Sequence, residues 1–196
     1  MLATLVSLTA CWGSGGHQRT ADKDGASPTG PSSTTSTTVS YAVPATIDAA
    51  YVEKVMKALD HLYGDAVRQL VTDHAMSDRF IKQLLALYSK TPFEGYQVVW
   101  RKSLNDGLKS IAPQPGDPLT HIQAVLQASP TCVVVQVDRD LSPTLARRQD
   151  ESPQRFVALI PKDPARDPLI ANPTPWTMSF DGYTQTGKVP EGPCEP

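Results

Sequence analysis

The chain has 196 residues, of which 40% are hydrophobic and 19% charged, and 18 Lys and Arg against 20 Asp and Glu give a net charge of -2. This length predicts one globular domain with a tail, and the balanced charge gives no reason to expect a nucleic-acid partner. No apolar run in the sequence reaches the roughly 18 residues that a membrane-spanning helix requires.

The first eleven residues indicate export. Residues 1–10 form an apolar stretch of signal-peptide length, and Cys11 follows directly. Leu8-Thr9-Ala10-Cys11 resembles a bacterial lipobox, in which the cysteine thiol is acylated and the preceding peptide is removed. An apolar cytosolic N-terminus is the alternative interpretation. No Lys or Arg precedes Arg19, so we expect the true signal peptide to begin upstream of Met1.

The lipobox predicts a lipoprotein whose membrane anchor is a palmitate-type lipid on Cys11, at the extracytoplasmic face of the cell membrane. Residues 11–44 would then be its tether. Ser, Thr, Gly and Pro make up 20 of the 33 residues from 12 to 44, too polar a composition to fold on its own. A coil of this length spans roughly 30 Å. O-linked sugars on the Ser/Thr cluster and a plain spacer both agree with this composition.

The folded unit, residues 45–196, is expected to begin with an amphipathic helix. Thr46 is its expected N-cap. Its apolar stripe recurs every three or four residues: Ile47, Tyr51, Val55, Leu59 and Leu62. Gly64 interrupts the pattern, and Asp65 can cap a continuation. A kinked helix and two abutting helices both fit.

Two further helices follow in the pattern. Ser77 is the expected cap of the second helix. At the third, Thr91 caps, Pro92 takes the first helical position and Glu94 completes a capping box. The apolar positions of this third helix continue to the prolines that end it: Tyr96, Trp100, Leu104, Leu108 and Ile111.

After Pro118 the apolar residues no longer recur every three or four positions but every second position, as in a strand. Four strands are expected, at residues 120–127, 132–138, 155–160 and 176–183. The predicted inward rows are Ile122, Ala124 and Leu126; Val133, Val135 and Val137; and Trp176, Met178 and Phe180. Helices followed by consecutive strands predict an α+β domain with an antiparallel sheet.

Two segments between these strands are expected to be irregular. Residues 141–154 are polar and predict an exposed hairpin tip. Residues 161–175 contain five prolines and predict an extended wrap over the surface.

Several short motifs follow the lipobox and tether: AYVEKVMKALDH, SPTCVVV, NPTPW, FDGY and a terminal GPC. In this order they resemble a group of actinobacterial surface lipoproteins of unknown function with an NTF2-like (cystatin-like) domain. The resemblance implies a cone, with helices packed on a curved antiparallel sheet of about four strands around a cavity. Relatives of this fold include isomerases and dehydratases, binding modules and homodimers.

Cys132 and Cys194 remain as a pair once Cys11 is acylated. In an oxidising envelope they are expected to form a disulfide. A buried thiol at Cys132 and a metal site are the alternatives, and the lack of a CxxC or a nearby histidine disfavours the metal. We expect no metal and no cofactor.

His121 is the main candidate for chemistry. A strand residue can point into a cone, where a helix carboxylate would make this histidine a general base. An exposed histidine explains the same pattern. His61 and Asp65, four residues apart, can share a helix face as metal ligands, and a solvated polar face is the alternative. No G-x-S-x-G or phosphate-binding loop occurs in the folded unit.

Four aromatic residues are candidates to line an apolar pocket: Tyr51, Tyr96, Trp100 and Trp176. Core packing is the alternative role for them. We therefore expect a non-catalytic binding or adaptor module of the cell envelope, whose partner is a small apolar ligand in the cone, an envelope protein or a second copy. The alternative is a small isomerase- or dehydratase-like enzyme that uses His121.

Overall fold

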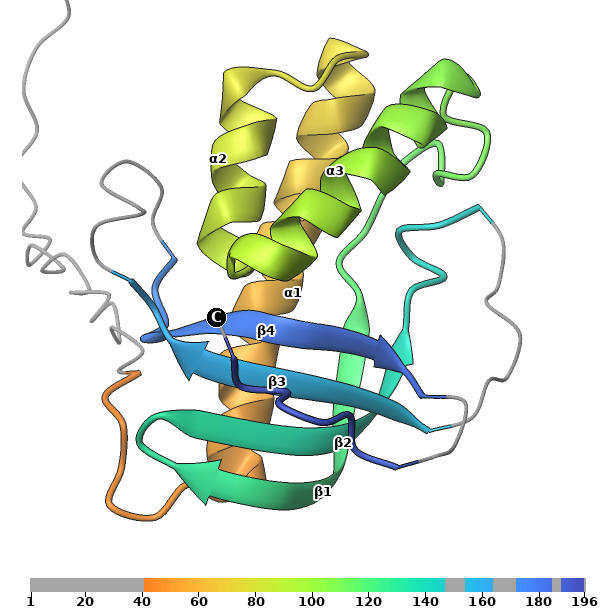
Figure 1. Cartoon of the computed structure of the whole chain (residues 1–196). Helices are drawn as coiled ribbons and strands as arrows, with labels where there is room; N and C mark the ends of the chain where they lie inside the picture. Colours follow the sequence, from red (N-terminus) through yellow and green to blue (C-terminus); the bar gives the residue numbers. More distant parts are fainter. Residues whose placement is uncertain (1–40, 147–153, 164–171, 185–187, 196) are drawn as a thin grey trace, which may run out of the picture. The chain divides into compact units, whose positions relative to one another are not determined.

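The computed structural model describes residues 41–146, 154–163, 172–184 and 188–195. The elements in chain order are α1 (Ala49–Asp73), α2 (Asp78–Leu87), α3 (Lys90–Asn105), β1 (Leu119–Ser129), β2 (Cys132–Asp140), β3 (Arg155–Pro161) and β4 (Trp176–Tyr183). The strands form one antiparallel sheet in the order β1-β2-β3-β4. Three helices pack against this sheet (Figure 1), which confirms the expected α+β class.

The expected signal peptide, Cys11 and the tether as far as residue 40 lie outside the described residues. Within the described ranges, no helix has the length and hydrophobicity needed to cross a membrane.

α1 is a single helix of 25 residues that runs through Gly64. Its N-cap is Asp48, whose Oδ1 accepts from the Tyr51 amide at 2.8 Å, so the cap expected at Thr46 is wrong. A Cβ built on Gly64 would lie 2.1 Å from Asp117 Oδ1. The glycine therefore makes room for a carboxylate from outside the helix, and no second helix begins beyond it.

The start of α2 agrees with the sequence pattern, and the start of α3 does not. Ser77 caps α2 as expected, its Oγ accepting from the Phe80 amide at 3.4 Å. The N-cap of α3 is Ser89, two residues before the expected Thr91. The Ser89 amide donates to Met178 O at 2.9 Å, so backbone pairing with β4 sets where α3 begins.

α3 also ends earlier than its apolar period indicates. Its last residue is Asn105, and the expected continuation to Ile111 is wrong. Gly107 and Leu108 have φ values of 69° and 58°, which lie in the left-handed region and are incompatible with an α-helix.

Bulges decide which residues of β1 face the helices. The register of β1 against β2 shifts between Ile122 and Ala124 and again between Val125 and Gln127. Ile122 and Val125 consequently pack against the core, whereas Leu126 is exposed. The expected inward row is therefore wrong beyond Ile122, because each bulge reverses the alternation.

A bulge in the middle of β4 has the same effect. Met178 pairs with Leu159 and Phe180 pairs with Ala158, which leaves Ser179 as the extra residue. Trp176 and Met178 lie in the main core, but Phe180 packs on the opposite face, so its predicted inward position is wrong.

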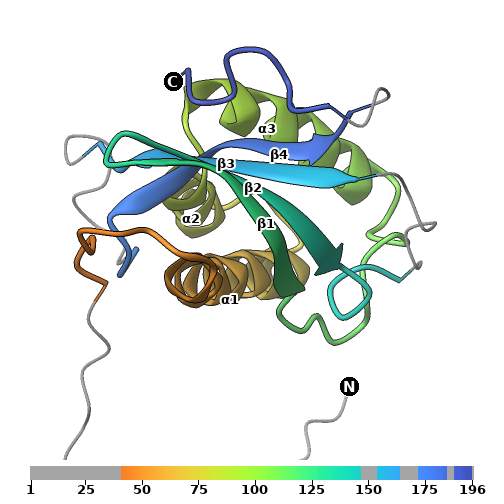
Figure 2. The same ribbon diagram turned by 90° about the horizontal axis from the view of Figure 1, so that it is seen from below.

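The two faces of the sheet are covered differently (Figure 2). The helices bury the face that carries Val133, Val135 and Val137, as expected for β2. On the other face, the C-terminal segment runs over β2 and β3. Cys132 and Cys194 lie there at disulfide bonding distance, with Cα atoms 5.6 Å apart.

The segment after β2 is not wholly an exposed loop. Leu141 and Thr144 are buried, and Thr144 Oγ1 donates to Gly116 O at 3.0 Å. The expected exposed tip is therefore wrong for Leu141 and Thr144, and residues 147–153 lie outside the described part. Of the expected extended wrap, residues 164–171 also lie outside it.

Candidate functional site

A cavity of about 320 Å³ lies between α3 and the end of the sheet where β2 and β4 finish and β3 starts. We call it the α3 cavity. Its wall is mainly apolar and aromatic, with side chains from α1, α3 and the segments that follow α3 and β2: Tyr63, Tyr96, Val99, Trp100, Ile111, Leu141 and Leu145. Arg139, Arg155 and Asp181 form a charged end of the same lining.

These three charged residues and Asp60 form a chain of buried ion pairs, the charge cluster. Arg139 Nη2 lies 2.6 Å from Asp60 Oδ1, and Arg139 Nη1 donates to Asp181 Oδ2. Arg155 Nη2 lies 2.7 Å from Asp181 Oδ1. The Asp181 side chain is only 1% exposed. Two cations and two anions therefore compensate one another, as buried charges must.

The fold explains why these charges face inward. Arg139 continues the inward row of β2 two residues after Val137, and Arg155 begins the inward row of β3. The bulge at Ser179 turns Asp181 toward the helices instead of away from them. Asp60 lies on the buried face of α1. The four side chains meet because three strand ends and the middle of one helix converge.

The pKa values of the two carboxyl groups in the charge cluster are shifted in opposite directions. Burial raises the pKa of Asp60 above its ordinary value, although the Arg139 guanidinium acts the other way. Burial also acts to raise the pKa of Asp181, but Arg139 and Arg155 together outweigh it and hold that pKa below its ordinary value. Asp181 therefore stays ionised at neutral pH, where it accepts hydrogen bonds but is only a weak base.

Two phenols lie beside the charge cluster, and that of Tyr96 donates a hydrogen bond to it. Burial raises the pKa of Tyr63 to about 12 and also raises that of Tyr96. Tyr96 Oη donates to Asp181 Oδ2 at 3.2 Å, and the ring of Tyr63 lies 5.6 Å from the guanidinium carbon of Arg139. Both hydroxyls therefore keep their protons at neutral pH.

The indole of Trp100 lines the α3 cavity and carries a buried donor that is unused. The side chain packs against Phe80, edge to face, and against Tyr63. Its Nε1 is buried and has no hydrogen-bond partner in the described part of the chain. A buried N–H without an acceptor is destabilising, so a group that reached this atom would gain a hydrogen bond.

The four aromatic residues singled out from the sequence separate into two pairs. Tyr96 and Trp100 line the α3 cavity. Tyr51 and Trp176 lie elsewhere, where Trp176 Nε1 donates to Tyr51 Oη at 2.9 Å and Tyr51 Oη donates to Tyr41 O at 3.2 Å. This second pair ties the segment before α1 to β4.

His121 lies outside the α3 cavity. Its side chain is 69% exposed, and its Nδ1 lies 3.5 Å from Glu53 Oε1 on α1. This position corresponds to the exposed alternative for this histidine, and the α3 cavity has no histidine among its lining residues.

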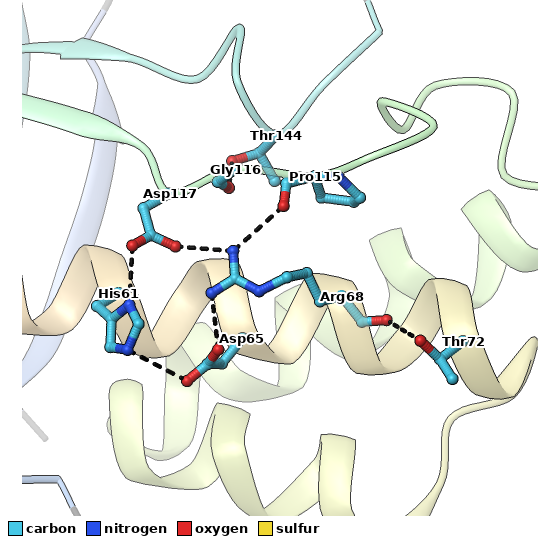
Figure 3. A network of polar contacts seen from close by, with 8 residues as sticks. All are labelled: His61, Asp65, Arg68, Thr72, Pro115, Gly116, Asp117 and Thr144. Carbon is cyan, nitrogen blue, oxygen red and sulfur yellow. Dashed lines mark hydrogen bonds and ion pairs between the residues drawn. The ribbon is translucent and has the colours of Figure 1, made fainter.

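The carboxylates near His61 are occupied by Arg68 (Figure 3). His61 Nδ1 lies 2.8 Å from Asp117 Oδ2, and its Nε2 lies 3.6 Å from Asp65 Oδ2. Arg68 Nη1 and Nη2 bind the other oxygens of the same two carboxylates at 2.9 and 2.7 Å. Arg68 also donates to Pro115 O at 3.2 Å. The network ties α1 to the segment before β1.

No group of three or more His, Cys, Asp or Glu side chains within the described ranges is arranged to hold a metal ion.

Sequence reasoning did not single out Asp60, Arg139, Arg155 or Asp181. A signal was present for two of them, because Arg139 and Arg155 occupy positions that continue inward rows of valine and leucine. A charge at such a position indicates either the end of a strand or a buried ion pair. No protein-family model, curated protein or solved structure matches this chain.

Proposed function

We propose that this protein is a lipid-anchored binding module of the cell envelope, with an NTF2-like domain that holds a small, largely apolar ligand in the α3 cavity. The observation that carries this proposal is the cavity itself, with an apolar wall and a few polar groups at one end. Sites of this composition and size are typical of small-molecule binding.

The lining suggests what the ligand looks like. The side chains of Val99, Ile111 and Leu141 favour an apolar body, and the unpaired Nε1 of Trp100 favours one hydrogen-bond acceptor on it. The charge cluster is neutral as a whole, so a ligand with a net charge would lie beside it without a counter-charge. An uncharged ligand with a carbonyl or hydroxyl oxygen fits best.

Two observations favour binding over catalysis. His121 is exposed and lies outside the α3 cavity. Asp181 lines the cavity, but two guanidinium groups lower its pKa, which makes it a poor proton acceptor. Both observations weigh against the enzyme alternative, which uses His121 inside a cavity.

The envelope location rests on the cysteines. The pairing of Cys132 with Cys194 is typical of an oxidising compartment. Cys11, the proposed anchor, lies outside the described residues.

Native mass spectrometry of the full-length protein, purified from an oxidising envelope, tests the proposal. We expect the mass of one small molecule in addition to that of the chain. Val99→Trp should fill the α3 cavity and lose this mass, because Val99 lines it. Val98→Trp is the matched control, since Val98 is the preceding residue on α3 and lies outside this cavity.

A ligand-free mass for the unmodified protein would overturn the proposal, and so would equal retention of the ligand by both variants. A ligand-free dimer or a co-purified protein would point to the adaptor interpretation instead.

A further inference from the structure

A second cavity, of about 460 Å³, lies where α2 meets α3 above the end of β3 and the start of β4. We call it the junction cavity. Leu85 and Ile160 contribute apolar surface, and Ser89, Lys90, Lys162 and Thr177 contribute polar groups. It shares no lining residue with the α3 cavity, so the two can be tested separately.

Among the described residues, three in the lining have a buried hydroxyl without a partner, Tyr88, Ser89 and Thr177, and the last two carry the argument. Ser89 is 3% exposed and Thr177 is 7% exposed. Neither Ser89 Oγ nor Thr177 Oγ1 has a hydrogen-bond partner within the described ranges. Ser89 is the N-cap of α3, yet its side chain makes no capping hydrogen bond. Buried hydroxyls are normally satisfied, so an acceptor in the cavity would supply what both of them lack.

The same place is the positive end of a helix. α3 has 16 residues and no acidic side chain in its first turn. The first amides of a helix have no partner inside it, and the helix dipole attracts an anion there. The Ser89 amide is already used by Met178 O, which leaves the amide of Lys90, the next lining residue, for a ligand. Pro92 has no N–H to offer.

The charged side chains of the lining also favour an anion. Lys90 and Lys162 are cationic, and Asp163 is the acidic member of the lining. Asp163 has an interaction partner of its own. Lys162 Nζ donates to Asn172 O at 2.9 Å, which holds this lysine close to the cavity and leaves further ammonium protons for a ligand. The lining therefore has a net positive charge.

We propose that the junction cavity is a phosphate-binding site. The two hydroxyls of Ser89 and Thr177, the Lys90 amide and two ammonium groups offer more donors than the two oxygens of a carboxylate can accept. They suit the three or four oxygens of a phosphate. The apolar surface of Leu85 and Ile160 leaves room for an organic substituent on that phosphate. The group is either a soluble phosphate or the headgroup of a phospholipid, a distinction that matters for a chain with a proposed membrane anchor.

Equilibrium binding to the full-length protein in phosphate-free buffer tests this site. The two probes are inorganic phosphate and a short-chain phosphatidylglycerol below its micelle concentration, each compared with chloride at equal ionic strength. We expect saturable binding of at least one probe. Binding of inorganic phosphate assigns a soluble source, and binding of phosphatidylglycerol alone assigns a lipid headgroup.

Ser89→Ala and Thr177→Val remove the hydroxyls with almost no change in shape. We expect each variant to weaken binding about tenfold or more, because a hydrogen bond to a charged group contributes that much. Lys102→Ala is the control, since Lys102 is an exposed lysine in the last turn of the same helix.

Thermal melting without a probe verifies that both variants fold. Each should melt at or above the temperature of the unmodified protein, since a buried hydroxyl without a partner is removed. The proposal is overturned if neither probe binds, or if both hydroxyl variants bind the probe as tightly as the unmodified protein.

Discussion

Asp181→Asn is the substitution that tests most directly how the charge cluster contributes to stability. Asp181 accepts from Arg139, Arg155 and Tyr96, and its side chain is 1% exposed. Asparagine has the same shape but no charge. The variant would leave two buried guanidinium groups facing the single carboxylate of Asp60.

The magnitude follows from this burial. Removing one partner of a buried ion pair costs about 3–5 kcal/mol, because the remaining charge stays buried without compensation. A domain of this size loses about 2–4 °C in melting temperature per kcal/mol. We therefore expect Asp181→Asn to melt about 6–20 °C below the unmodified protein, and its urea midpoint to fall in proportion.

Asp117→Asn is the matched control. Asp117 also contacts two basic side chains, His61 at 2.8 Å and Arg68 at 2.9 Å, but its own side chain is 37% exposed. Exposed ion pairs contribute about 0–1 kcal/mol, so this variant should lose at most about 1 kcal/mol. Equal losses in the two variants, or a loss below about 1 kcal/mol in Asp181→Asn, would refute the reasoning from burial.

Three further measurements follow from the same structure. The lowered pKa of Asp181 means that its carboxylate stabilises the folded state fully above the ordinary value of 3.8, and this contribution should disappear as the pH falls through the lowered pKa. Urea titrations from pH 2 to 6 should show that the free energy of unfolding falls less on acidification in Asp181→Asn than in the unmodified protein. An equal dependence on pH in the two proteins would contradict this prediction. Gly64→Ala should stabilise the protein by up to about 1 kcal/mol, through helix propensity, only when Asp117→Ala is also present. In the unmodified background the new Cβ meets Asp117 Oδ1. A double-mutant cycle that shows no coupling between the two substitutions would exclude this contact. Reduction of the Cys132–Cys194 pair, which closes a loop with a sequence separation of 62, should cost about 4 kcal/mol, and an unchanged urea midpoint after reduction would exclude the bridge.

Local sequence patterns were sufficient where a residue and its neighbours along the chain determine the structure. The cap of α2 at Ser77 depends on an amide three residues away. The inward row of Val133, Val135 and Val137 depends only on the alternation of an extended strand. The order of helices and strands likewise predicted an α+β domain with an antiparallel sheet, because consecutive strands pair most simply with one another.

Other features depend on atoms distant in sequence, and no local pattern encodes them. The start of α3 at Ser89 follows from a hydrogen bond to Met178 O. The continuity of α1 at Gly64 becomes understandable once Asp117 is seen to occupy the space beside it. In both cases the partner lies more than 50 residues away, so the pattern around the residue favoured a different boundary.

The candidate site shows the same division. Tyr96 and Trp100 were identified from the helical period, which determines the face of α3 that they share. Asp181 could not be identified in this way, because a bulge at Ser179 turns it inward, and a bulge arises from how two strands pair. The sequence by itself determined the elements and much of the core; the tertiary structure alone decided which charges are buried together, since each is stable there only when the others compensate it.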